Sequence, residues 1–183
     1  TRKESSAASD VYKRQFQYGG MSFVDFAHLN RGNIKNGILD YNRQKTGTSM
    51  RLEVLDTAEA MYKELAGERA GSSGYLFPFL SGTKNGHEEY LEYNAALSRF
   101  NRNLKTLKEV AGITSDVTSY TIRHSFAMAL KEQNVPIEMI SELLGHKSIK
   151  TTQIYLRSFS LEKMTVVNKS CFENVYNYMP EVG

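Results

Sequence analysis

Four side chains in three short motifs are of types that can bind and attack a phosphate group. They are Lys45 in the motif KTG, Arg123 in SYTIRHSFA, and His146 and Tyr155 in LLGHKSIKTTQIY. A guanidinium offers a planar fork to two phosphate oxygens, and an imidazole can donate a hydrogen bond to one of them. A tyrosine oxygen can act as a nucleophile once cations or a base offset its ordinary pKa of about 10. A lysine at a turn can protonate a leaving oxygen.

The two later motifs resemble the catalytic blocks of the tyrosine recombinases, also called phage-type integrases. In that family an arginine in the first block, a histidine after Leu-Gly and a tyrosine nine residues further on belong to one active site. Arg123, His146 and Tyr155 match these positions at this spacing. Lys45 matches the lysine of the family's hairpin turn, and GMSFVD at 20–25 matches its first helix block. The resemblance therefore covers roughly residues 16 to 179.

The resemblance implies an α+β, mainly α, tyrosine recombinase catalytic-domain fold with a small antiparallel β-sheet. It also implies an enzyme that cuts and rejoins double-stranded DNA in site-specific recombination, to integrate or excise a mobile element. Arg123 and His146 would stabilise the phosphorane while Tyr155 attacks, and Lys45 would assist the leaving oxygen. A covalent 3′-phosphotyrosine would conserve the bond energy, so no cofactor and no metal is expected. The family's assembly implies a homotetramer on DNA, held through the C-terminal helix.

Two positions depart from the family pattern. The family has a histidine three residues before the arginine of the first block, and here Tyr120 stands at that supporting position. The family's first arginine belongs to the GMSFVD block, where this chain has Ser22. Loss of a guanidinium removes several kcal/mol of transition-state stabilisation unless another cation replaces it. Arg43, two residues before Lys45, is our hypothesis for the substitute.

Apolar spacing and turn residues predict the elements that must position these side chains. The first expected elements are a helix near 22–30 with Ser22 and Asp25 as a capping pair, a hairpin within 38–54 and a helix starting at 56. A helix at 88–111 follows, with an apolar stripe that runs to Ala111. The last elements are helices at 119–133, 136–144 and 148–156 and an amphipathic helix at 161–179. Pro136 is expected in the first turn of its helix. This arrangement would place the arginine block, the histidine and the tyrosine on successive helices.

The helix at 88–111 also carries a basic stripe. Arg99, Arg102 and Lys105 lie largely off its apolar face, and Lys108 continues the series. Such a stripe is either a solvated helix face or a surface that binds the DNA backbone, and both readings stay open.

Composition limits the class of protein without naming a partner. The chain has 183 residues, which suits one domain, and 23 basic against 20 acidic residues is too small a surplus to indicate nucleic acid. There is no apolar run of about 18 residues, so no membrane span is expected. A single cysteine, Cys171, and the absence of Cys/His spacing typical of zinc favour a reducing compartment without a structural metal. We therefore expect a cytoplasmic protein, and the resemblance further implies a bacterial one that joins the nucleoid when bound to DNA.

Domain organisation leaves alternatives open. We expect residues 1–15 to be a disordered or artefactual leader and 16–183 to be the catalytic domain, without the family's N-terminal core-binding domain. One alternative is a non-catalytic helix-turn-helix protein, because the helices at 136–144 and 148–156 have the size of that motif. Another is an inactive recombinase relic, suggested by Ser22. Only an active enzyme would form a covalent DNA adduct that Tyr155→Phe abolishes.

Overall fold

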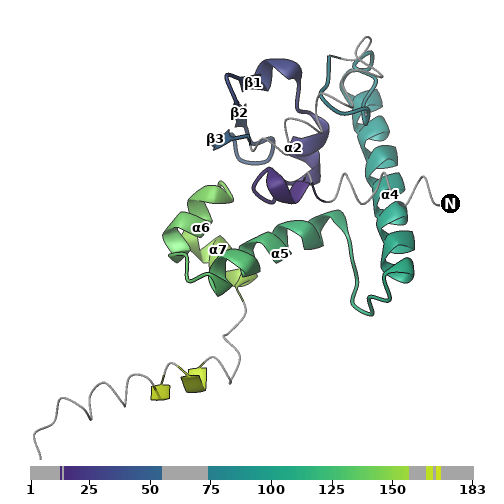
Figure 1. The fold of residues 1–183 in the computed structure, drawn as a ribbon. Helices are drawn as coiled ribbons and strands as arrows, with labels where there is room; N and C mark the ends of the chain where they lie inside the picture. The colour runs from purple at the N-terminus through teal and green to yellow at the C-terminus, as the bar shows by residue number, and fades with distance from the viewer. Residues whose placement is uncertain (1–12, 14, 55–73, 157–163, 167, 170–183) are drawn as a thin grey trace, which may run out of the picture.

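The computed structural model describes residues 13, 15–54, 74–156, 164–166, 168 and 169, and within them the fold is mainly helical with one small sheet (Figure 1). In chain order its elements are α2 (Phe23–Ala27), the 3₁₀ turn η1 (Arg31–Asn33), β1 (Ile34–Lys35), β2 (Ile38–Asn42), β3 (Ser49–Glu53), α4 (His87–Val110), α5 (Ser119–Glu132), α6 (Ile137–Leu143) and α7 (Ile149–Tyr155). The predicted fold class is confirmed. The helix predicted from residue 56, nearly all of the leader and most of the helix at 161–179 lie outside the described residues.

The sheet is antiparallel, with the strand order β1-β2-β3. Leu39 pairs with Leu52 and Tyr41 with Met50, so the hairpin predicted within 38–54 is confirmed. Strand β1 was not predicted, because two residues are too short to show the alternation that marks a strand. In β2 the side chains alternate between buried and exposed, which is typical of a sheet with one face on the core.

Helix α2 joins the sheet to the long helix α4. Phe26 stacks on Phe77 at 4.1 Å between ring centroids in the core beneath the sheet. Phe23 faces the other way and stacks on Phe100 of α4 at 4.9 Å. Rings at these separations contribute more than their buried area alone. This short helix is therefore fixed from two sides, although it is shorter than the predicted span of 22–30.

Helix α4 buries Ala96, Phe100 and Leu104 along one face. The stripe was predicted to continue to Ala111, and this is wrong: Ala111 is exposed and lies just past the end of α4. The helix ends there because Gly112 adopts a left-handed backbone, with φ of 66°, which breaks the helical hydrogen-bonding pattern.

Helices α5, α6 and α7 form the second part of the fold. Thr118 caps α5 with a reciprocal capping box to Thr121, and Asn134, with φ of 61°, follows its end. Pro136 is the N-cap of α6 and not a first-turn residue as predicted. A small apolar cluster of Ala127, Ile140 and Leu144 packs α5 against α6.

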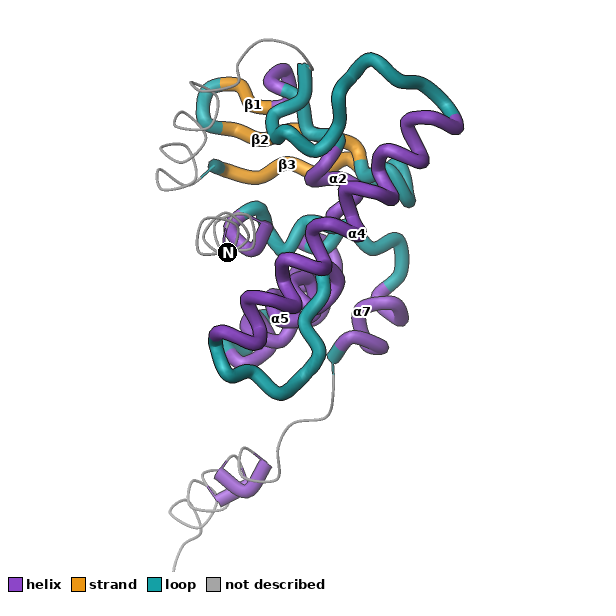
Figure 2. The backbone as a smooth tube through the Cα atoms, turned by 90° about the vertical axis from the view of Figure 1, so that its right-hand side faces the viewer, coloured by secondary structure: helices purple, strands orange, loops and turns teal. Residues whose placement is uncertain are grey.

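Figures 1 and 2 show the sheet at one end, α5 to α7 at the other, and α4 running past both. Gln15 is fully buried and donates hydrogen bonds to Met21 O at 2.7 Å and Ser119 O at 3.3 Å. Its side chain thereby ties the segment before α2 to the start of α5. Among the described helices, none combines the length and the hydropathy that crossing a membrane requires.

Candidate active site

A pocket of about 520 Å³ lies where the hairpin turn, α2, α4 and α5 meet the segment that leads into α7. It brings together six residues singled out from the sequence: Ser22, Arg43, Lys45, Tyr120, Arg123 and His146. These residues come from segments more than 100 positions apart in the chain. The basic stripe does not take part, since Arg99, Arg102 and Lys105 are exposed on α4 and do not line the pocket.

The charge of the pocket lining is one-sided. Four cationic side chains line it, namely Arg43, Lys45, Arg123 and Lys147, and within the described residues no carboxylate does. Lys147 was not predicted as a site residue, because a lysine beside the motif histidine has no spacing signal of its own. A cavity lined by one sign of charge concentrates ligands of the opposite sign. The pocket is therefore suited to an anion.

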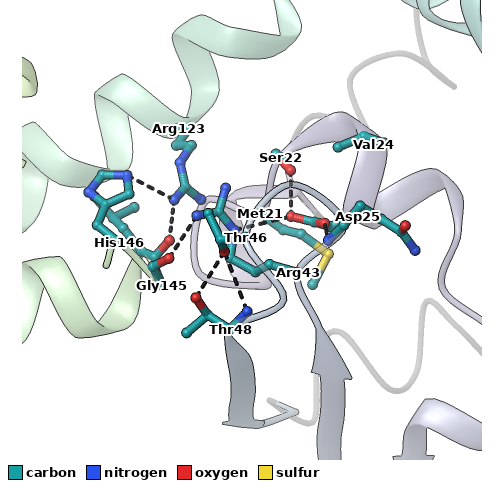
Figure 3. A network of polar contacts seen from close by, with 12 residues as sticks. Met21, Ser22, Val24, Asp25, Arg43, Thr46, Thr48, Arg123, Gly145 and His146 are labelled. Atoms are coloured by element: carbon teal, nitrogen blue, oxygen red, sulfur yellow. Dashed lines mark hydrogen bonds and ion pairs between the residues drawn. The ribbon is translucent and has the colours of Figure 1, made fainter. Parts of the chain in front are cut away.

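Arg123 is held by backbone carbonyls. It is 4% exposed, and its guanidinium donates to Gly20 O at 3.1 Å and to Leu144 O. Figure 3 shows Arg123 next to His146 and Arg43. Gly20 has φ of 63°, and a Cβ there would lie 2.7 Å from Cβ of Phe126 on the same helix as Arg123. Only glycine fits this close approach of the chain to α5. Two carbonyl acceptors thus fix the arginine while leaving it positively charged.

Arg43 lies beside it and is held differently. It is 6% exposed, its Nη1 donates to Gly145 O at 2.8 Å, and its Nε lies 3.4 Å from Asp25 Oδ2. Gly145 has φ of 60°, and a Cβ there would lie 2.4 Å from Sδ of Met50 and 2.6 Å from Cδ of Arg43. The Leu-Gly-His motif needs its glycine both to end α6 and to admit this arginine.

Asp25 organises the hairpin turn from behind the pocket. Its buried carboxylate accepts from Ser22 Oγ at 2.5 Å and from the Gln44 amide at 2.7 Å, in addition to its ion pair with Arg43. The predicted capping pair is therefore wrong in detail. Ser22 is the N-cap of α2 but makes no side-chain cap hydrogen bond, because its hydroxyl donates to the Asp25 carboxylate. Asp25 was not predicted as a site residue.

His146 is neutral at neutral pH. Burial, reinforced by the charges of Arg123, Arg43 and Lys45, lowers the pKa of His146 to about 4. Its Nδ1 lies 2.8 Å from Oγ1 of Thr152, and its Nε2 lies 3.3 Å from Nη2 of Arg123. The imidazole is thus oriented by α7 on one side and α5 on the other.

The remaining predicted residues lie at the rim or on α7. Lys45 is exposed in the turn between β2 and β3, which a hydrogen bond between Thr46 and Thr48 braces. Tyr120 is exposed in the first turn of α5. Tyr155 is the last residue of α7, whose backbone packs against α5 and α6.

Comparison with known proteins identifies the family of this chain. Residues 16–162 match the phage integrase family. The chain is 34% identical over 120 residues to the tyrosine recombinase XerC of Rickettsia prowazekii (strain Madrid E), a match that covers 56% of this chain and 39% of that protein. The chain thus spans about two fifths of the length of this curated relative.

Two solved structures share the fold. A crystal structure of XerA recombinase aligns with a TM-score of 0.63 at 20% identity, covering 91% of this chain and 62% of that one. The second is a post-cleavage complex of XerH site-specific recombinase bound to palindromic difH substrate. It aligns with a TM-score of 0.64 at 17% identity, covering 91% of this chain and 49% of that one. Since the family match spans most of the chain, this protein belongs to the phage integrase family, the tyrosine recombinases.

Proposed function

We propose that residues 16–183 form the catalytic domain of an enzyme that cuts and rejoins DNA through a 3′-phosphotyrosine in site-specific recombination. The observation that carries this proposal is the pocket lining, in which two buried guanidiniums and two lysines face one cavity and, among the described residues, no carboxylate does. A DNA phosphodiester gains negative charge on its non-bridging oxygens in the transition state, and fixed cations are the groups that stabilise it. Integration or excision of a mobile element is the biological setting we propose.

The proposed chemistry assigns one task to each side chain. The Tyr155 phenol loses its proton to water and its oxygen attacks the phosphorus. The bond to the 5′ oxygen breaks, and Lys45 gives that oxygen its proton. Arg123 and His146 contact the non-bridging oxygens. Tyr120, exposed at the mouth of the pocket, is placed to donate a hydrogen bond to the DNA backbone. Attack by the 5′ hydroxyl of another strand then reverses the step, so the exchange needs no external energy source.

Arg43 takes the place of the missing first arginine in this proposal. It is nearly as buried as Arg123 and lines the same pocket. Arg123 donates to the carbonyl of Leu144, and Arg43 donates to the next carbonyl along the chain, that of Gly145. The ion pair with Asp25 fixes its orientation. Ser22, at the position of the family's arginine, serves this arrangement by donating to the same carboxylate.

The proposed partners are double-stranded DNA in the bacterial cytoplasm and further copies of the chain. Exposed cations at Arg99, Arg102 and Lys105 of α4 are candidates for contacts with the DNA backbone. A separate pocket of about 410 Å³ between α5, α6 and α7 is lined mainly by apolar side chains, including Val135, Ile137 and Ile140. We assign it to the amphipathic C-terminal segment of a neighbouring protomer in a homotetramer.

Covalent trapping tests the proposal and separates it from its alternatives. The chain is incubated with a pool of nicked suicide duplexes of randomised core sequence, and a denaturing gel detects protein that carries DNA. The proposal predicts an adduct that Tyr155→Phe abolishes. A helix-turn-helix protein or an inactive relic would bind DNA without forming an adduct, and that result would refute the proposed activity.

A further inference from the structure

The His146 imidazole is held at both nitrogens by neighbours of different chemistry. Nδ1 lies 2.8 Å from the hydroxyl of Thr152, a residue with no exposed surface, and Nε2 lies 3.3 Å from Nη2 of Arg123. A threonine hydroxyl can donate or accept a hydrogen bond, whereas a guanidinium can only donate. The two contacts therefore restrict where the imidazole can carry its proton.

In the empty site the contact with Arg123 decides the tautomer. Because Nη2 of Arg123 donates, Nε2 of His146 must accept, and a neutral ring then carries its proton on Nδ1. Thr152 Oγ1 accepts that proton at 2.8 Å. The charged groups that face the ring are Arg123 from α5 and Arg43 and Lys45 from the hairpin turn, and all three oppose a second proton on it.

The proposed reaction needs the opposite tautomer. A phosphate oxygen only accepts, so Nε2 must carry the proton when it contacts the transition state. The Thr152 hydroxyl can rotate and donate to Nδ1, which satisfies both groups in this second state. A carboxylate in its place could not donate and would hold the proton on Nδ1, and an apolar side chain would pair with neither form.

We propose that Thr152 is a positioning residue that stabilises both tautomers of His146: its hydroxyl accepts the Nδ1 proton in the empty site, where Arg123 donates to Nε2, and donates to Nδ1 when Nε2 carries its proton to a bound phosphate oxygen. Nδ1 releases its proton to water, Nε2 takes one from water, and the ring stays neutral throughout. The part that concerns phosphate rests on the proposed function. The part that concerns the empty site does not.

Nitrogen NMR of the free chain tests the empty site. The protein is labelled with ¹⁵N-histidine, and the signals of His146 are assigned by their loss in His146→Gln. At neutral pH we expect the Nδ1 shift of a protonated nitrogen and the Nε2 shift of an unprotonated one. Thr152→Ser should keep the Nδ1 proton hydrogen-bonded, whereas Thr152→Val removes its acceptor, so the Nδ1 proton resonance should move upfield and exchange faster with water. A wild-type ring protonated on Nε2, or a Thr152→Val spectrum like that of the wild type, would overturn the proposal.

The rate at which the protein cleaves the nicked suicide duplex tests the state in which Nε2 carries the proton. In Thr152→Val the buried Nδ1 of His146 loses its hydrogen-bond partner. We therefore expect the covalent step to be roughly 10- to 100-fold slower in Thr152→Val and to recover in Thr152→Ser. Thermal unfolding of both variants separates this effect from loss of fold, and Thr152→Ala serves if the valine variant does not fold. Equal rates in the folded variants would overturn the phosphate half. If the wild type forms no adduct, the proposed function fails, while the NMR result still decides the tautomer.

Discussion

Replacing Arg43 by alanine tests whether its guanidinium takes part in catalysis or only forms a structural ion pair. Removing a preorganised donor aimed at transition-state charge typically slows a reaction by about 10²–10³-fold, which corresponds to about 2.7–4 kcal/mol. Arg43 is 6% exposed, so water screens its charge little, and we expect a loss within this range. The assay is the single-turnover rate of covalent complex formation on a nicked suicide duplex. Arg51→Ala, which removes an exposed arginine of β3, is the matched control.

The same substitution also leaves the buried Asp25 carboxylate without its ion pair. Breaking a buried pair costs about 3–5 kcal/mol of folding stability, and the remaining hydrogen bonds from Ser22 and Gln44 favour the lower end. The double variant Arg43→Ala/Asp25→Asn removes the unpaired charge. It should recover most of the melting temperature while its cleavage stays slow. A folded Arg43→Ala protein that cleaves at the wild-type rate, or a double variant that recovers rate and stability together, would refute the catalytic assignment.

Three further predictions concern pH, packing and DNA affinity. Because the pKa of His146 is about 4 in the folded chain and about 6.5 when unfolded, the unfolded state binds more protons between these values. The contribution of the neutral His146 to folding stability is complete above pH about 6.5 and is lost as the pH falls to 4. In urea titrations, the free energy of unfolding should therefore fall more steeply with decreasing pH in the wild type than in His146→Gln. Gly145→Ala should lower the melting temperature more than Gly37→Ala, since both positions have positive φ but only the first meets neighbouring atoms within 4 Å; equal shifts would contradict the packing account. Arg102→Ala should weaken DNA binding and reduce the slope of log affinity against log salt by about 1, and an unchanged slope would remove this residue from the interface.

The sequence identifies candidate site residues, whereas it does not predict the contacts that orient them. Arg123 and His146 could be located because each belongs to a motif within a single helix or at a helix end, and local signals mark both. The hydrogen bonds from Arg123 to Gly20 and from Arg43 to Gly145 join residues more than 100 positions apart, and no periodicity or turn signal reports such contacts. Thr152 was passed over for a related reason, since a threonine within a helix has no distinguishing pattern.

In the fold, too, locally encoded features could be predicted and features that depend on long-range contacts could not. Helix α5 agrees with its predicted span to within one residue, because its cap and its end are encoded locally by Thr118 and Asn134. Strand β1 and the early end of α2 depend on packing against neighbours that are distant in sequence. Tertiary contacts therefore decide short elements, whereas long amphipathic helices are evident from their pattern.

The chemical identity of the trapped complex is the most direct test of Tyr155 as the nucleophile. The adduct from the suicide substrate is digested with protease and nuclease, and mass spectrometry locates the nucleotide on the peptide. Attack by Tyr155 predicts a 3′-phosphate ester on its oxygen and a free 5′ hydroxyl on the released strand. A phosphate attached to any other residue, a 5′ linkage, or no adduct from folded protein would contradict it.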